Sequence, residues 1–259
     1  MIPDPPILHD PWFWLLGIVA VTLVGLAKGG FTGVGTLGMP LLVLGVPPVQ
    51  AAAIMLPLLI VQDVVGVWSF HRSWDRHIML VMLPGGAIGV VLGYLFAASL
   101  PEDWILLALG VITIIFATRQ LWIARGGRAV PSHKLPDWVG ALCGVCAGLT
   151  SQIAHTGAPP YQIWVFPQRL PRDVLVGTTA IFFASLNWMK VPAYAGLGQF
   201  TATNLVASAA LLPVAIAATF AGVRLVRRVP AERFYGMIYW LTLAVGAKLL
   251  WDAVALLTG

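Results

Sequence analysis

Hydrophobic residues along the chain form ten runs, separated by short stretches rich in glycine, proline and charged residues. The runs cover residues 12–28, 36–46, 50–70, 77–99, 103–123, 138–150, 158–167, 174–197, 201–223 and 234–257. A helix of about 20 apolar residues crosses a bilayer core of roughly 30 Å. Six of the runs reach that length. The pattern therefore predicts an all-α polytopic membrane protein.

The four shorter runs form two adjacent pairs, 12–28 with 36–46 and 138–150 with 158–167. A stretch rich in glycine, threonine and serine divides each pair, at residues 28–40 and 148–160. Each pair predicts a broken helix or a re-entrant hairpin. Non-helical backbone at membrane depth is tolerated only inside the protein or along a cavity, because an unpaired backbone group in lipid is costly.

The two halves of the chain also show a weak internal repeat. Pro84 and Trp122 recur as Pro213 and Trp251, each 129 positions later. We predict a single membrane transport domain over residues 1–259, with repeat 1 at 12–123, a cytoplasmic linker at 124–137 and repeat 2 at 138–257. Each repeat would hold one hairpin and three transmembrane helices.

Composition and charge agree with this prediction. Hydrophobic residues make up 59% of the chain and charged residues 10%, whereas soluble domains are roughly 25% charged. This excludes a water-soluble globule. The net charge of +5 comes from basic clusters between the runs, so we expect no nucleic-acid partner.

Twelve of the fifteen basic residues lie in four groups: Arg72 and Arg76; Arg119, Arg125, Arg128 and Lys134; Arg169 and Arg172; Arg224, Arg227, Arg228 and Arg233. Short loops rich in Lys and Arg stay in the cytoplasm. Both termini are then expected outside, equivalent loops lie on opposite sides, and the two repeats are inverted. The first residues lack a basic region and a small-residue cleavage site, so we expect no cleavable signal peptide.

Ionisable residues inside the runs are the first candidates for function, because charges within a membrane are costly. Asp63 is the only acidic residue in the core of a run, and Lys190 has no acidic residue within reach on its own helix. We expect these two to pair, either as part of a substrate site or as a purely structural ion pair. Lys248 has a simpler explanation, since Asp252 follows one helical turn later.

The two breaks predict a cavity for a small anion, because helices that restart inside a membrane direct free N–H groups and a positive dipole end toward it. The candidate binding residues are Lys28, Gly33, Gly35, Thr36, Gly38, Ser151, His155, Thr156, Gly157, Asn187 and Lys190. Packing and back-bonding within membrane helices are the alternative explanation for the glycines and threonines.

Other chemistry has little support in the sequence. Cys143 and Cys146 are the only cysteines and lie within an apolar run. No cysteine, carboxylate or second histidine lies at ligand spacing from His155, so a zinc site is not expected. Gly85, Gly89 and Gly93 recur every four residues, which is typical of close helix packing. We expect no cofactor and no enzymatic activity.

The chain resembles the TauE/SafE family of sulfite exporters over essentially its whole length. The resemblance rests on residues 25–35 (GLAKGGFTGVG), the following Gly38-Met-Pro40, the run containing Asp63, and Asn187-x-x-Lys190-x-x-x-Tyr194 with the glycines at 196 and 198. It implies a bacterial inner-membrane transporter of sulfite, organosulfonates or related anions. The second break, at residues 150–156, has less glycine than is usual in the family.

Together these observations predict a secondary transporter that rocks its two halves around a fixed site near the middle of the bilayer. Asp63 is the candidate proton-coupling residue. The partners expected are a small anion, the lipid bilayer and protons, and a homo-oligomer is compatible with the sequence. The alternatives are a membrane-embedded sulfur-relay or redox enzyme using Cys143 and Cys146, and a passive anion channel.

Overall fold

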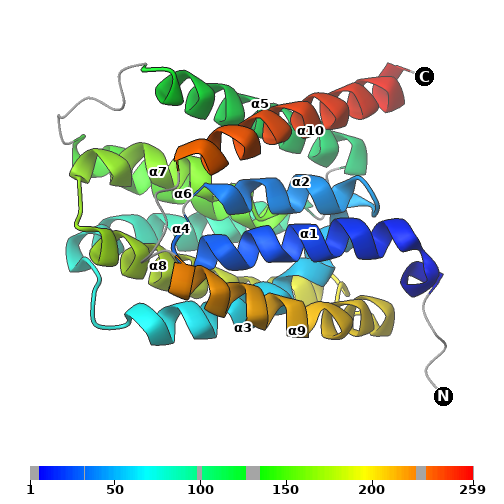
Figure 1. Ribbon diagram of the computed structural model, residues 1–259, viewed down its shortest axis with the longest axis horizontal. Coiled ribbons are helices and arrows are strands. Elements are labelled where there is room, and N and C mark those ends of the chain that lie inside the picture. Colours follow the sequence, from blue (N-terminus) through cyan, green and yellow to red (C-terminus); the bar gives the residue numbers. More distant parts are fainter. Residues whose placement is uncertain (1–5, 32, 98–100, 127–134, 226–231, 259) are drawn as a thin grey trace.

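The computed structural model describes residues 6–31, 33–97, 101–126, 135–225 and 232–258, and it shows helices joined by turns (Figure 1). The long helices are α1 (Pro11–Lys28), α3 (Pro48–Phe70), α4 (Arg76–Ala97), α5 (Glu102–Ala124), α6 (Asp137–Ala154), α8 (Arg172–Gly196), α9 (Ala202–Leu225) and α10 (Glu232–Thr258). The short ones are α2 (Gly38–Val43) and α7 (Ala158–Val165), with 3₁₀ turns η1 (Pro6–His9), η2 (Val34–Leu37) and η3 (Phe166–Gln168). This part of the chain contains no β-strand.

Proline marks the start of most long helices. Helices α1 and α3 begin at Pro11 and Pro48, and Pro101, Pro136 and Pro171 directly precede α5, α6 and α8. A proline at a helix start costs no hydrogen bond, since the first N–H groups of a helix have no partner within it. The observed helices therefore begin and end close to the bounds that the apolar runs predicted.

Seven helices of the described residues are long and apolar enough to cross a membrane: α1, α3, α4, α5, α8, α9 and the Tyr239–Thr258 part of α10. The prediction of an all-α polytopic membrane protein is confirmed. The first run, which looked short in the sequence, gains a residue at its start and forms an 18-residue helix.

The interrupted pairs form two hairpins. After Lys28 the chain turns, and η2 and α2 pack back along α1; after Ala154 it turns again, and α7 packs back against α6. In Figure 1 the hairpin of α1 and α2 lies between α5 and α10 on one side and α3 and α9 on the other. Each half therefore has the same order of elements, a hairpin followed by three long helices.

Close helix crossings hold the two halves together. The predicted packing role of Gly85, Gly89 and Gly93 is confirmed, because all three lie against α6. A β-carbon on Gly89 would overlap the carbonyl oxygen of Val145, and one on Gly148 of α6 would overlap the backbone of α4. Only glycine allows these two backbones to approach so closely.

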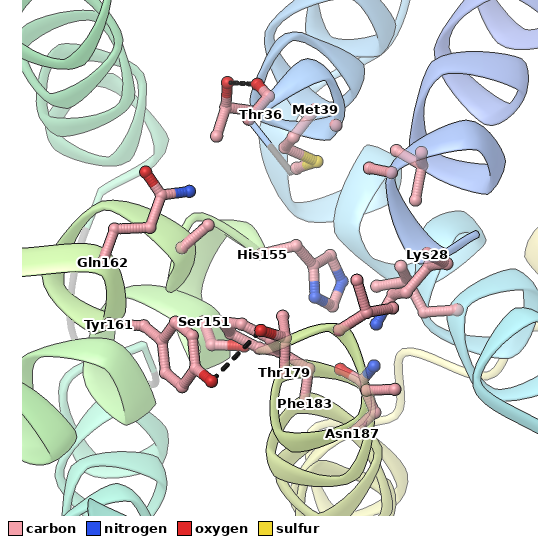
Figure 2. Close-up of a pocket in the computed structure, with 18 of the residues that line it drawn as sticks. Lys28, Thr36, Met39, Ser151, His155, Tyr161, Gln162, Thr179, Phe183 and Asn187 are labelled. Carbon is pink, nitrogen blue, oxygen red and sulfur yellow. Dashed lines mark hydrogen bonds between the residues drawn. The ribbon is translucent and has the colours of Figure 1, made fainter. Parts of the chain in front are cut away.

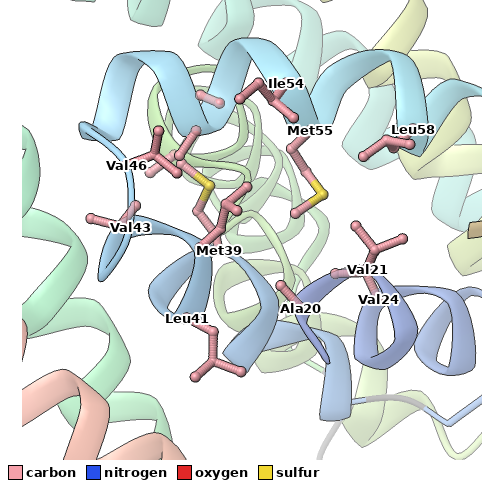
Figure 3. Close-up of a cluster of buried hydrophobic side chains, with 14 of the residues drawn as sticks. Ala20, Val21, Val24, Met39, Leu41, Val43, Val46, Ile54, Met55 and Leu58 are labelled. Atoms are coloured by element: carbon pink, nitrogen blue, oxygen red, sulfur yellow. The ribbon is translucent and has the colours of Figure 1, made fainter. Parts of the chain in front are cut away.

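The buried core around α2 is almost entirely apolar. Ala20, Val21 and Val24 of α1 face Met39 of α2 and Met55 of α3, and all five side chains are buried (Figure 3). The short helix is thus held between two long helices by hydrophobic contacts, and its first residue, Gly38, lies against Ala20 and Val24 of α1.

The start of α1 and the end of α10 lie at one end of the bundle, and the α3–α4 and α7–α8 connections lie at the other (Figure 1). These connections carry Arg72, Arg169 and the start of α8 at Arg172. Of the remaining predicted cytoplasmic residues, Arg128, Lys134, Arg227 and Arg228 are outside the described residues.

The arrangement gives a topology that can be tested. Reporter fusions at Gly127 should show a cytoplasmic signal, and fusions at Pro101 and Gly259 an external one, because basic loops remain in the cytoplasm. Paired alkaline phosphatase and green fluorescent protein fusions measure this at each site. A cytoplasmic signal at Gly259 would contradict the prediction.

Candidate functional site

A cavity of about 110 Å³ lies where the two chain breaks meet (Figure 2). A single water needs only about 10–15 Å³ of such space, so several waters or a small oxyanion fit. Its walls come from both hairpins and from α3 and α8. The lining residues are Val24, Ala27, Lys28, Gly33, Gly35, Thr36, Met39, Met55, Leu59, Ser151, His155, Ala158, Tyr161, Gln162, Phe166, Val176, Thr179, Ala180, Phe183 and Asn187. The cavity expected from the two breaks is therefore present.

The first break carries Lys28 into the cavity wall. Lys28 is the last residue of α1, where a positive charge interacts favourably with the helix dipole. The chain then turns through Gly30 and Gly33, whose φ angles of 122° and 97° lie in the left-handed region that favours glycine. Thr36 closes the turn by donating its hydroxyl to the Gly33 carbonyl at 2.6 Å.

Asp63 is held by one partner from each half of the chain. Its Oδ1 lies 2.5 Å from the Lys28 ammonium, and its Oδ2 accepts a hydrogen bond of 2.5 Å from the Asn187 amide. The Asp63 side chain is only 1% exposed and Lys28 is 14% exposed. Asp63 therefore lies behind the cavity wall, and Lys28 and Asn187 form part of that wall.

The predicted ion pair between Asp63 and Lys190 is wrong. Asn187 and Lys190 are separated on α8 by about 60° of rotation and about 4.5 Å of rise, and Asn187 is the residue that contacts Asp63. The carboxylate partner is Lys28 of α1 instead. The prediction failed because it did not consider that Lys28 could compete with Lys190 for Asp63.

Lys190 is fully buried and is bound by neutral groups. Its Nζ lies 3.1 Å from both the carbonyl oxygen and the hydroxyl oxygen of Ser151, and 2.7 Å from His155 Nδ1. No carboxylate of the described residues forms an ion pair with it. It does not line the cavity, although Ser151 and His155 do. Lys190 therefore forms a second layer behind them.

His155 connects Lys190 to the cavity. It ends α6 with a left-handed backbone, φ 51°, which turns the chain toward α7. Its Nε2 lies 2.9 Å from the Ala52 carbonyl. Because a carbonyl oxygen only accepts, Nε2 carries the ring hydrogen of neutral His155, and Nδ1 is left to accept from Lys190. The ring also stacks on Tyr194, with centroids 5.9 Å apart.

The second break offers fewer backbone donors than the sequence interpretation assumed. Helix α7 begins Ala158-Pro159-Pro160, and proline has no N–H. Thr156 donates its hydroxyl to the Thr150 carbonyl, and Gly157 packs against α6. The anion-binding capacity on this side therefore rests on side chains more than on the start of the helix.

The structure brings most of the predicted residues to one place. Those that line the cavity are Lys28, Gly33, Gly35, Thr36, Ser151, His155 and Asn187. Those that support it from behind are Gly38, Thr156, Gly157, Lys190 and Asp63. In Figure 2 the side chains of Lys28, His155 and Asn187 point toward a common region, opposite Tyr161 and Gln162.

Sequence reasoning missed Tyr161, Gln162, Thr179 and Phe183, which also line the cavity. Thr179 donates its hydroxyl to Tyr161 at 3.1 Å, and the Lys28 ammonium lies 5.6 Å from the Phe183 ring centroid. A signal for two of them was present, because Thr179, Phe183 and Asn187 are spaced four residues apart on α8 and share one face.

The cavity is chemically suited to a small anion that carries an apolar part. A positive charge, hydroxyl groups and an amide provide hydrogen-bond donors, and Met39, Met55, Leu59 and Phe166 provide an apolar surface beside them. Cation, hydroxyl and amide groups of this kind bind oxyanions through charge-assisted hydrogen bonds.

The two cysteines lie elsewhere. Cys146 is exposed on the outside of the bundle and Cys143 is partly exposed, and neither lines the cavity. The arrangement gives no support to a sulfur-relay reaction at the cavity.

Comparison with known proteins identifies one family. A sequence model for the family described as "Sulfite exporter TauE/SafE" matches residues 17–249. Comparisons with curated proteins and with solved structures found no match.

The geometry predicts unequal roles for two lysines. Lys190→Ala should weaken binding of a small anion about ten- to a hundredfold, or about 1.4–2.8 kcal/mol, because Lys190 is the buried amine that contacts Ser151 and His155 from behind the cavity wall. Lys248→Ala should leave binding unchanged, because Lys248 is exposed and pairs with Asp252 on α10. Titration calorimetry on both variants measures the difference. Equal losses would show that the cavity charge is not specific to Lys190.

Proposed function

The chain belongs to the TauE/SafE family of sulfite exporters, and on this basis we propose that it is a secondary transporter that moves sulfite or an organosulfonate across the bacterial inner membrane. The observation that carries the proposal is the cavity between the two chain breaks, with Lys28, Ser151, His155 and Asn187 on its wall. Discontinuous helices that meet at a polar cavity are typical binding sites of secondary transporters.

The pattern of helix packing supports an inverted repeat and alternating access. If each half repeats the other, α1 corresponds to α6, α3 to α8, α4 to α9 and α5 to α10. Helix α1 packs on α9 as α6 packs on α4, and α3 packs on α9 as α8 packs on α4. The corresponding helices α3 and α8 pack together, as do α5 and α10. A two-fold relation between the halves would produce this set of contacts.

Within this mechanism Lys28 is the residue that meets the substrate. Its ammonium is bound to Asp63 but is also partly exposed to the cavity. An arriving anion would compete with the Asp63 carboxylate for Lys28. Ser151 and Asn187 would donate further hydrogen bonds, and the apolar wall would hold the organic part of a sulfonate.

Asp63 remains the proposed proton-coupling residue. A proton on Asp63 would remove the negative charge that holds Lys28 and would free the ammonium for the anion. Anion and proton would then bind together, and a pH gradient could drive the anion.

Flux through proteoliposomes tests the proposed function. Labelled sulfite or methanesulfonate should enter faster when the same unlabelled anion is present inside, because exchange is a property of a carrier and not of a passive channel. Lys28→Gln should slow the flux at least about tenfold, equivalent to about 1.4 kcal/mol. Chloride and lactate serve as competing anions that test selectivity.

Cys143→Ala/Cys146→Ala is the matched control, because both cysteines lie away from the cavity. Its flux should equal that of the unmodified protein. Loss of flux in this variant would favour the sulfur-relay alternative, and flux without exchange stimulation would favour a channel.

A second prediction concerns Asp63. Asp63→Asn protein should still exchange anion for anion but should no longer respond to a pH gradient, because asparagine cannot take up the coupling proton. The variant leaves Lys28 without its carboxylate, which costs roughly 3–5 kcal/mol for a buried pair. Thermal melting should therefore accompany the flux assay, with Lys28→Gln/Asp63→Asn as the charge-balanced comparison. Full drive by a pH gradient in folded Asp63→Asn protein would remove Asp63 from this role.

A further inference from the structure

Lys190 is a fully buried amine without a carboxylate partner in the described part of the chain. It lies one layer behind Ser151 and His155, which separate it from the cavity. We propose that Lys190 gains a proton when an anion enters the cavity and loses it when the anion leaves, so that each bound monoanion is accompanied by one proton. This inference rests on the proposed anion-binding function and adds a protonation site distinct from Asp63.

The three polar neighbours of Lys190 can satisfy it in either protonation state. A neutral amine has two N–H donors and one lone pair, and an ammonium has three donors. The Ser151 carbonyl and His155 Nδ1 accept one hydrogen bond each in both states. The Ser151 hydroxyl, 3.1 Å away, can donate to the lone pair of the amine or accept from the ammonium. Rotation of this one hydroxyl therefore accommodates the change.

The charges around the cavity indicate why a bound anion would control the protonation of Lys190. The ionisable groups facing this part of α8 from neighbouring elements are Lys28 of α1, Asp63 of α3, His155 at the end of α6 and Tyr94 of α4 beside Gly196. Lys28 and Asp63 pair with each other. A charged Lys190 would therefore have no counter-ion in an empty cavity, and a buried unpaired charge is unfavourable. A bound monoanion supplies the missing negative charge.

The Ser151 hydroxyl also provides a route for the proton. Ser151 lines the cavity and contacts Lys190. A hydronium ion in the cavity gives a proton to Ser151 Oγ and becomes water, while the original hydroxyl hydrogen passes to the lone pair of Lys190 Nζ. The hydroxyl is regenerated, the amine becomes an ammonium, and no other bond changes. Release of the anion reverses the transfer.

Proton uptake on binding tests the inference. Methanesulfonate is the probe, because it stays a monoanion throughout the neutral pH range, whereas sulfite changes its own charge there. Calorimetric titrations of the purified full-length protein in two buffers of different ionisation enthalpy give the number of protons taken up. We expect Lys190 to contribute about one proton per anion, in addition to any proton taken up by Asp63, and an affinity that falls at least about tenfold per pH unit where the empty cavity holds neutral Lys190.

Two substitutions fix the charge of Lys190 in opposite states. Lys190→Arg keeps a positive charge that cannot be lost, and Lys190→Gln has none. Both variants should bind methanesulfonate with about one proton fewer taken up per anion than the unmodified protein and with a correspondingly weaker dependence of affinity on pH, and Lys248→Gln should behave like the unmodified protein. Melting curves identify which variants are folded.

Ser151→Ala provides a further test that preserves Lys190. It removes an acceptor from the ammonium and a donor to the neutral amine, and the charged state loses more, so proton uptake near neutral pH should fall; methanesulfonate should still bind, but more weakly, because a cavity hydroxyl is lost. Proton uptake that persists unchanged in folded Lys190→Arg or Lys190→Gln protein, or in Ser151→Ala, overturns the inference and leaves the proposed transport function and the role of Asp63 intact. Failure of the unmodified protein to bind either methanesulfonate or sulfite would contradict the proposed function itself.

Discussion

The contact between Lys28 and Asp63 in the interior of an apolar bundle is the interaction on which the rest of the site depends. Either charge alone would be costly among buried hydrophobic residues, and removing one partner would leave the other uncompensated. Asn187 binds the second oxygen of Asp63, so the carboxylate joins α1 and α3 of the first half to α8 of the second. One buried acid thereby fixes three helices that each contribute to the cavity wall.

The chain breaks follow from the same requirement. In a continuous helix the backbone N–H and C=O groups pair with one another along the helix axis. Such a helix would leave no space for a cavity. Ending α1 at Lys28 and α6 at Ala154 brings two turns together inside the bundle, where they face a cavity instead of lipid. Glycine at the α4–α6 and α1–α9 crossings then allows the long helices to close around the turns. The close packing of the long helices thus keeps the irregular backbone of the two turns inside the protein and away from lipid.

The helices and the location of the cavity could be predicted from the sequence, but the pairing of its charges could not. Apolar runs and prolines determine where helices begin, and two Gly-rich interruptions indicate where helices are broken. A rotation of α8 by about 60° decides whether Asn187 or Lys190 reaches Asp63. Hydrophobic periodicity does not resolve such a rotation, because the helix is apolar on most sides. Tyr161 and Gln162 were missed for a related reason, since their position depends on the turn made by His155.

The arrangement of charges separates two tasks that one lysine could not perform together. Lys28 is partly exposed and bound to a carboxylate, so an anion must compete with Asp63 for it. Lys190 is enclosed by a carbonyl, a hydroxyl and a neutral imidazole, which provide hydrogen bonds without a compensating charge. Under the proposed function, the first environment suits a direct contact with the substrate. The second makes the charge of the amine depend on what occupies the cavity, and such dependence is what links an anion to a proton without direct contact between them.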